Sequence, residues 1–106
     1  TQSDLVAGQL SINATTRTIY LSGKELELTR REYDLLYYLA VNRGLTFSRE
    51  QLLDHVWGYD FEGGYRTVDT HIRQLRGKLG DCADYIRTIH CVGYQFEVPN
   101  ENTDTK

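Results

Sequence analysis

The chain has 106 residues, enough for one domain with its own apolar core, and its apolar and charged fractions are ordinary for globular proteins. No apolar run approaches the ~20 residues needed to cross a bilayer, and residues 1–4 lack the basic and apolar regions of a secretory signal. These features argue against a membrane-spanning or secreted protein. Because the chain lacks a starting Met, we expect a piece of a longer cytoplasmic protein, with a linker remnant at 1–4, one domain at 5–98 and a flexible polar tail at 99–106.

The net charge of −3 is unevenly distributed along the chain. Residues 1–64 hold six basic and nine acidic side chains, whereas residues 65–79 hold four basic side chains and one acid, Asp69. The local field matters more than the total charge when a polyanion approaches. The pattern therefore fits a nucleic-acid-binding face at 65–79, and it fits a merely solvated basic helix face equally well.

The first part of the domain has strand character. Residues 5–12, 17–21 and 24–28 are rich in apolar, β-branched or alternating positions, and short turns at 13–16 and 22–23 separate them. Closely spaced turns of this kind predict three short antiparallel strands.

Two helices should follow, each opened by a capping box in which side chains satisfy free backbone N–H groups. The first box runs from Thr29 to Glu32 and the second from Ser48 to Gln51. Gly44 and Gly58 are placed to end the two helices. The residues expected to point inward are Leu35, Leu36, Leu39 and Ala40 in the first helix, and Leu52, Leu53, Val56 and Trp57 in the second.

The glycine-rich segment 58–64 predicts a loop that carries two aromatic side chains, Tyr59 and Phe61. Such side chains either pack against the edge of the core or are exposed for contact with a partner. We favour the core, because apolar loop residues usually fill edges.

A third helix is predicted over 66–79, with a buried stripe of Val68, Ile72, Leu75 and Leu79. After it, 85–89 and 94–98 bracket a short turn at 90–93, which predicts a C-terminal β-hairpin. The order of elements indicates an α+β fold of the winged helix-turn-helix type, with an N-terminal antiparallel sheet, three helices and a hairpin wing. In that architecture the helix at 66–79 enters the major groove of DNA and the wing, at about 85–97, contacts the flanking minor groove or backbone.

Four segments carry a resemblance that covers essentially 5–98. They are LELTRREYDLL at 26–36, SREQLLDHVWG at 48–58, RTVDTHIRQLRGKL at 66–79 and IRTIHCVGYQF at 86–96. Together, in this order, they resemble the effector domain of OmpR/PhoB-family two-component response regulators.

The resemblance implies roles for individual residues. In the third helix, three residues match positions where the family contacts base edges: Thr70, Arg73 and Gln74. Four match positions where the family contacts phosphates: Arg66, Thr67, His71 and Arg76. Lys78 is a further candidate for DNA contact. Arg87, Thr88 and His90 are the candidates in the wing. The loop residues Tyr59, Asp60, Phe61 and Glu62 match a segment that such regulators can offer to RNA polymerase.

The chain departs from the family pattern in the wing and at two helix positions. His90 and Cys91 stand where Arg and Gly are usual, so wing affinity and turn shape are expected to differ. Gln74, often Arg in relatives, shifts the expected base preference from guanine toward adenine, and Gly77 replaces a long side chain.

The resemblance also implies partners. We expect double-stranded promoter DNA with tandem half-sites, RNA polymerase, a receiver domain absent from this chain, and a sensor kinase acting through that domain. No cofactor or metal and no catalytic activity are expected.

Four other interpretations compete with this one. Cys82 and Cys91 could form a disulfide, although two free thiols are favoured without a secretory context. Zinc binding by these cysteines with His71 and His90, or a Cys91–His71 hydrolase, lacks recognisable ligand or catalytic spacing. A winged helix used for protein contacts rather than DNA stays open, since it fits the acidic body.

Overall fold

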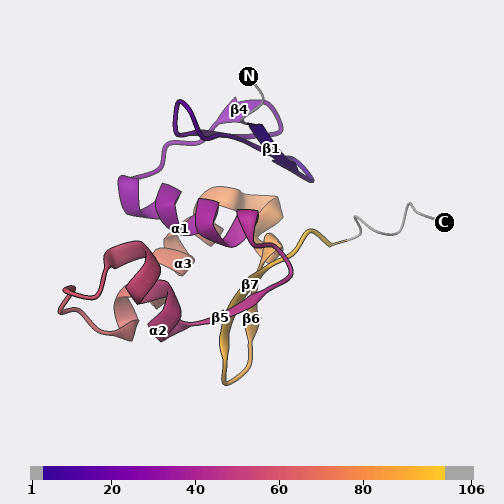
Figure 1. Ribbon diagram of the computed structural model, residues 1–106. Coiled ribbons are helices and arrows are strands. Elements are labelled where there is room, and N and C mark those ends of the chain that lie inside the picture. The colour runs from indigo at the N-terminus through magenta and orange to yellow at the C-terminus, as the bar shows by residue number, and fades with distance from the viewer. Residues whose placement is uncertain (1–3, 100–106) are drawn as a thin grey trace.

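The computed structural model describes residues 4–99. The linker predicted at 1–4 and the tail predicted at 99–106 lie outside this range, except at Asp4 and Pro99. Two antiparallel sheets enclose a group of helices, with the N-terminal sheet and the tip of the C-terminal hairpin at opposite ends of the molecule (Figure 1). The predicted α+β winged-helix architecture is confirmed.

The N-terminal sheet has four strands rather than the three predicted. They are β1 (Asp4–Ala7), β2 (Leu10–Asn13), β3 (Thr18–Leu21) and β4 (Lys24–Glu25), paired in that order. The predicted first strand is split at Gly8, which has a φ of +59°. A Cβ at Gly8 would collide with the Tyr85 hydroxyl, so glycine is required both for the turn and for the close approach. The predicted third strand is shorter than expected, because the chain leaves the sheet after Glu25.

The helices begin where the capping boxes predicted. In α1 (Arg30–Val41) the Thr29 hydroxyl accepts from the Glu32 N–H and the Glu32 carboxylate accepts from the Thr29 N–H. The second box is complete between Ser48 and Gln51 and opens α2 (Arg49–Leu52), which continues as a π-helical turn, η1 (Leu53–Trp57). Leu52 and Leu53 are buried as predicted, whereas Val56 and Trp57 are only half-buried.

The C-terminal half holds the third helix and the hairpin. Helix α3 (Tyr65–Leu79) runs into a short 3₁₀ segment, η2 (Gly80–Tyr85), which the sequence patterns did not predict. The hairpin is β6 (Ile86–Ile89) and β7 (Gly93–Phe96). A strand that was not predicted, β5 (Thr46–Ser48), pairs with β7 and joins the hairpin to the helices. Only glycine fits at position 93, since a Cβ there would strike the Phe47 carbonyl.

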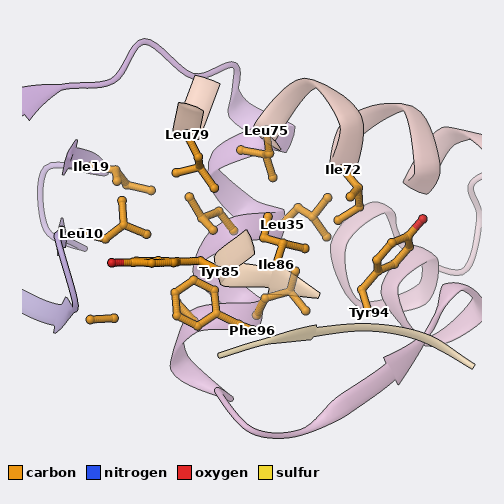
Figure 2. Packing of buried hydrophobic residues seen from close by; sticks show 14 of the residues in the cluster. Leu10, Ile19, Leu35, Ile72, Leu75, Leu79, Tyr85, Ile86, Tyr94 and Phe96 are labelled. Carbon is orange, nitrogen blue, oxygen red and sulfur yellow. The ribbon is translucent and has the colours of Figure 1, made fainter. Parts of the chain in front are cut away.

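One continuous core unites these parts. Leu10 and Ile19 come from the N-terminal sheet, Leu35 from α1, and Ile86 and Phe96 from the hairpin, and all are almost fully buried (Figure 2). The Tyr85 hydroxyl points out of this core toward the sheet, where it accepts a hydrogen bond from the Gln9 N–H at 3.1 Å (Figure 2). The wing is therefore rooted in the same core as the sheet at the far end.

Glu32 is the one charged residue that is fully buried in the part of the chain described, at 2% exposure. Its carboxylate accepts hydrogen bonds from the Lys78 ammonium, at 2.6 Å, and from the Thr29 N–H. Burial alone would raise the pKa of Glu32, but the hydrogen bond and charge of Lys78 and the Thr29 N–H together hold that pKa below 4.5. The pair ties the start of α1 to the end of α3.

We predict that Glu32→Gln lowers the free energy of unfolding at pH 7 by about 1.5–3 kcal/mol, the range for a hydrogen bond to a charged group. Because the folded-state pKa of Glu32 is lowered, the stability it contributes is present above about pH 4.5 and is lost as the pH falls through that lower value. Urea unfolding at pH 7 and pH 3 measures this. The difference between the variant and wild type should be smaller at pH 3 than at pH 7, whereas Glu25→Gln, at an exposed position, should match wild type at both. An equal deficit at both pH values would contradict the assignment.

Cys91 lies in the hairpin turn with a φ of +64°, a conformation in which a side chain is strained. We predict that Cys91→Gly raises the free energy of unfolding by about 1 kcal/mol. Cys91→Ala is the matched control, because it removes the thiol and keeps the strained Cβ. An equal gain in Cys91→Ala would place the effect in the thiol rather than in the backbone.

Candidate nucleic-acid interface

The buried stripe of α3 fixes the rotation of that helix. Val68, Ile72, Leu75 and Leu79 are at most 1% exposed. An α-helix turns by about 100° per residue, so the side of α3 opposite the stripe is determined. We call this side the outward arc, and all of its residues are exposed: Arg66, Thr70, Arg73, Gln74 and Gly77. The arc holds two guanidinium groups, one hydroxyl, one amide and no acid.

One flank of α3 packs against α1 and η1 and carries Thr67, His71 and Lys78. His71 Nδ1 lies 2.9 Å from the Thr67 carbonyl oxygen, and its ring meets Trp57 edge-on with centroids 4.9 Å apart. Lys78 Nζ donates to Glu32 Oε1 and, at 2.8 Å, to the Glu27 carbonyl. His71 and Lys78 thus fix the position of the helix in the fold.

Lys78, a member of the predicted DNA-contacting set, is already engaged within the protein. Its ammonium neutralises a buried carboxylate and satisfies a backbone carbonyl. Releasing it would leave Glu32 buried without its counter-charge, which is strongly unfavourable. The structure thus gives Lys78 a role in the fold, and its contact with DNA stays a prediction.

The opposite flank of α3 faces the hairpin and carries Asp69 and Arg76. The Tyr94 hydroxyl donates to Asp69 Oδ1 at 2.6 Å. Arg76 donates to the Ile86 carbonyl from Nε at 3.1 Å and from Nη2 at 2.7 Å. Its Nη2 also donates to Thr88 Oγ1 at 2.8 Å. Arg76, expected at a phosphate, thus directs most of its guanidinium to the protein's own hairpin.

Asp69 is the acid that the sequence singled out on the basic helix without assigning it a role. Its second oxygen, Oδ2, lies 3.6 Å from Arg49 Nη1 at the start of α2. Burial first, and then the hydrogen bond and charge of Asp69, raise the pKa of Tyr94 to about 12. Tyr94 therefore stays a neutral donor, and the Asp69 carboxylate has partners on both the hairpin and α2.

Arg49 was missed by the sequence reasoning. Its side chain is 47% exposed, and it lines the groove between the start of α2 and the hairpin tip with Tyr65, Cys91 and Val92. The available signal was its position directly after the N-cap Ser48, in the first turn of the helix that precedes α3.

The wing candidates lie along β6 and in the turn. Arg87 and Thr88 are exposed on β6, and His90 is exposed in the turn that also contains Cys91. In the described part of the chain, no group of three His, Cys, Asp or Glu side chains is arranged to hold a metal ion. Cys82 is buried and Cys91 exposed, and no disulfide joins them.

The loop at 58–64 is exposed, and the preference for Tyr59 and Phe61 as core residues is wrong. Tyr59 is 83% exposed. Phe61 is 39% exposed, and its ring lies 6.0 Å from that of Trp57. Asp60 and Glu62 are exposed as well, so the loop offers two aromatic and two acidic side chains to solvent. Neither Tyr59 nor Phe61 belongs to the core cluster of the described residues, and Phe61 only borders it through Trp57.

Comparison with known proteins places this arrangement in a family. A family model described as "Transcriptional regulatory protein, C terminal" matches residues 23–96. The transcriptional regulatory protein VxrB of Vibrio cholerae is 46% identical over 95 residues, which are 90% of this chain and 38% of VxrB. The chain thus spans about two fifths of the length of such relatives.

Two solved structures have the same fold. The response regulator DrrB of Thermotoga maritima, described as an OmpR/PhoB homologue, superposes with a TM-score of 0.82 at 37% identity, covering 90% of this chain and 44% of DrrB. The DNA-binding domain of Klebsiella pneumoniae RstA, solved in complex with the RstA box, gives 0.81 at 30% identity, covering 91% of this chain and 98% of that domain. The chain belongs to the family of C-terminal effector domains of OmpR/PhoB-type transcriptional regulatory proteins.

Proposed function

We propose that this domain binds double-stranded promoter DNA in a sequence-specific manner and thereby regulates transcription. The observation that carries the proposal is the outward arc of α3. Its polar and cationic side chains are exposed to solvent, while the other sides of the helix pack against the protein. An exposed α-helix of this kind fits the major groove of B-DNA. The likeness to the RstA DNA-binding domain, solved in complex with the RstA box, supports it.

Within this proposal the side chains of the outward arc divide by chemistry. Thr70, Arg73 and Gln74 read base edges, with Arg73 suited to guanine and Gln74 to adenine. Arg66 and Thr67 lie in the first turn of α3, where free N–H groups favour a phosphate. His71, half-buried against Trp57, reaches the backbone only from the flank. Arg87, Thr88 and His90 add contacts from the wing, and Arg49 adds a cation beside it.

Partners of the whole regulator follow as further proposals from the family. They are a receiver domain in the same protein, a sensor kinase that acts on it, and tandem half-sites that two copies occupy. RNA polymerase is the proposed partner of the exposed loop with Tyr59, Asp60, Phe61 and Glu62. The domain would act in the cytoplasm, where the chromosome lies, and we assign it no catalytic role. No helix in the described range is long and apolar enough to span a membrane.

The experiment that tests the function measures binding to a duplex that the domain selects from a random pool, against unselected duplex, across salt concentrations. We predict selective binding whose affinity falls steeply with salt, because phosphate contacts release counterions. Arg73→Ala should weaken binding to the selected duplex by about 10- to 100-fold and reduce discrimination between the two duplexes.

The matched control is Arg30→Ala, which removes the same charge from an exposed position in α1. It should leave the discrimination ratio unchanged. Absence of binding to either duplex would contradict the proposed function and favour a protein-binding winged helix. Equal losses in the two variants would show that Arg73 contributes charge without reading a base.

A further inference from the structure

The hairpin is attached to α3 at two points that lie two helical turns apart. At the first, the Tyr94 hydroxyl on β7 donates to Asp69 at 2.6 Å. At the second, Arg76 binds the Ile86 carbonyl and the Thr88 hydroxyl on β6. Each of the two hairpin strands is thus held by one charged side chain of the same helix flank. We call these two attachments the wing clamp.

The clamp acts on a part of the molecule that needs support. An isolated two-stranded hairpin is marginally stable in water, and the third strand of this sheet, β5, has only three residues. The core holds the base of the hairpin through Ile86 and Phe96, while Thr88 and His90 are exposed further along it. The Tyr94–Asp69 bond lies beyond the base, since Tyr94 pairs with Thr88 in the ladder.

The chemistry of the clamp favours strong bonds. Both attachments pair a charged group on α3 with a neutral group on the hairpin, and such charge-assisted hydrogen bonds are stronger than neutral ones. The Arg76 guanidinium also lies over the Tyr94 ring, 5.8 Å from its centroid, which connects the two points. Tyr94 is 8% exposed, so water competes poorly for its hydroxyl.

We propose that Asp69, Arg76 and Tyr94 are positioning residues that lock the wing to the recognition helix, so that both reach DNA as one preorganised unit. This inference rests on the proposed function. A wing that is held in place before binding avoids the entropic cost of being ordered on DNA. It also fixes the distance between the bases that α3 reads and the DNA backbone that the wing contacts. The acid on the basic helix thus serves DNA binding without touching DNA.

The test uses Tyr94→Phe, which removes only the hydroxyl and keeps the buried ring. Tyr37→Phe in α1 is the matched control, since the Tyr37 ring stacks on Tyr33 and lies outside the clamp. Two measurements are made on the 106-residue chain. Amide hydrogen exchange of the free protein reports the opening of β6 and β7, and hydroxyl-radical footprinting on the selected duplex separates protection by α3 from protection by the wing.

We expect Tyr94→Phe to speed exchange in β6 and β7 by about tenfold, the effect of about one lost hydrogen bond. DNA affinity should fall by about three- to tenfold, as when a contact element must be ordered on binding. In the footprint, protection of the flanking nucleotides by the wing should weaken, while protection of the central bases by α3 should persist. Asp69→Ala should speed exchange in β6 and β7 at least as much, since it removes the Tyr94 acceptor and also the Arg49 partner. The double variant should exchange no faster than Asp69→Ala, because the Tyr94 hydroxyl has no acceptor left to lose.

Several results would overturn the inference. Exchange and footprint equal to those of Tyr37→Phe would show that the hydroxyl does not hold the wing. Uniform weakening of all protections together with a lower melting temperature would show that Tyr94 acts through overall stability. Additive losses in the double variant would show that Asp69 and Tyr94 act separately. If the wild-type chain protects no duplex, the proposed function fails, and with it the role of the clamp in DNA binding.

Discussion

Burial of one stripe of α3 is the constraint on which the rest of the structure depends. Val68, Ile72, Leu75 and Leu79 lie in the common core, so the helix has one permitted rotation about its axis. That rotation decides which residues face outward and which face the two flanks. Helices α1 and α2 and the 3₁₀ segment η2 contact α3, and the buried residues of the N-terminal sheet and of the hairpin belong to the same core cluster as the stripe.

The two flanks of α3 show why a count of basic residues overstates the charge available for a ligand. Of the four basic side chains of the helix, Lys78 is held by Glu32 and Arg76 by the hairpin. Arg66 and Arg73 remain on the outward arc. Two cations without such internal contacts, on an acidic domain, indicate modest affinity for a polyanion per domain, and the wing adds the remainder. Arg49 adds less, because it shares its charge with Asp69. Selectivity then depends on the few side chains of the arc and on the position of the wing.

Local signals in the sequence were sufficient for the helices. The capping residues at Thr29 and Ser48 and the apolar stripe of α3 each act within a few neighbouring residues, so their spacing alone predicted the elements. The features that were missed depend on contacts between distant segments. Strand β5 has only three residues and exists because Gly93 lets β7 approach. The Glu32–Lys78 pair joins positions 46 residues apart and the Asp69–Tyr94 bond positions 25 apart, which no local pattern encodes.

The most direct test of this account is a nuclear magnetic resonance titration of the ¹⁵N-labelled domain with the duplex it selects. The largest amide shifts should lie in the outward arc of α3 and in the hairpin turn, and β1–β4 should hardly change. Arg66, Thr70, Arg73 and His90 should be among the residues affected first. Shifts concentrated in the N-terminal sheet or in the 58–64 loop, with α3 unchanged, would contradict the assignment of α3 as the DNA-reading helix.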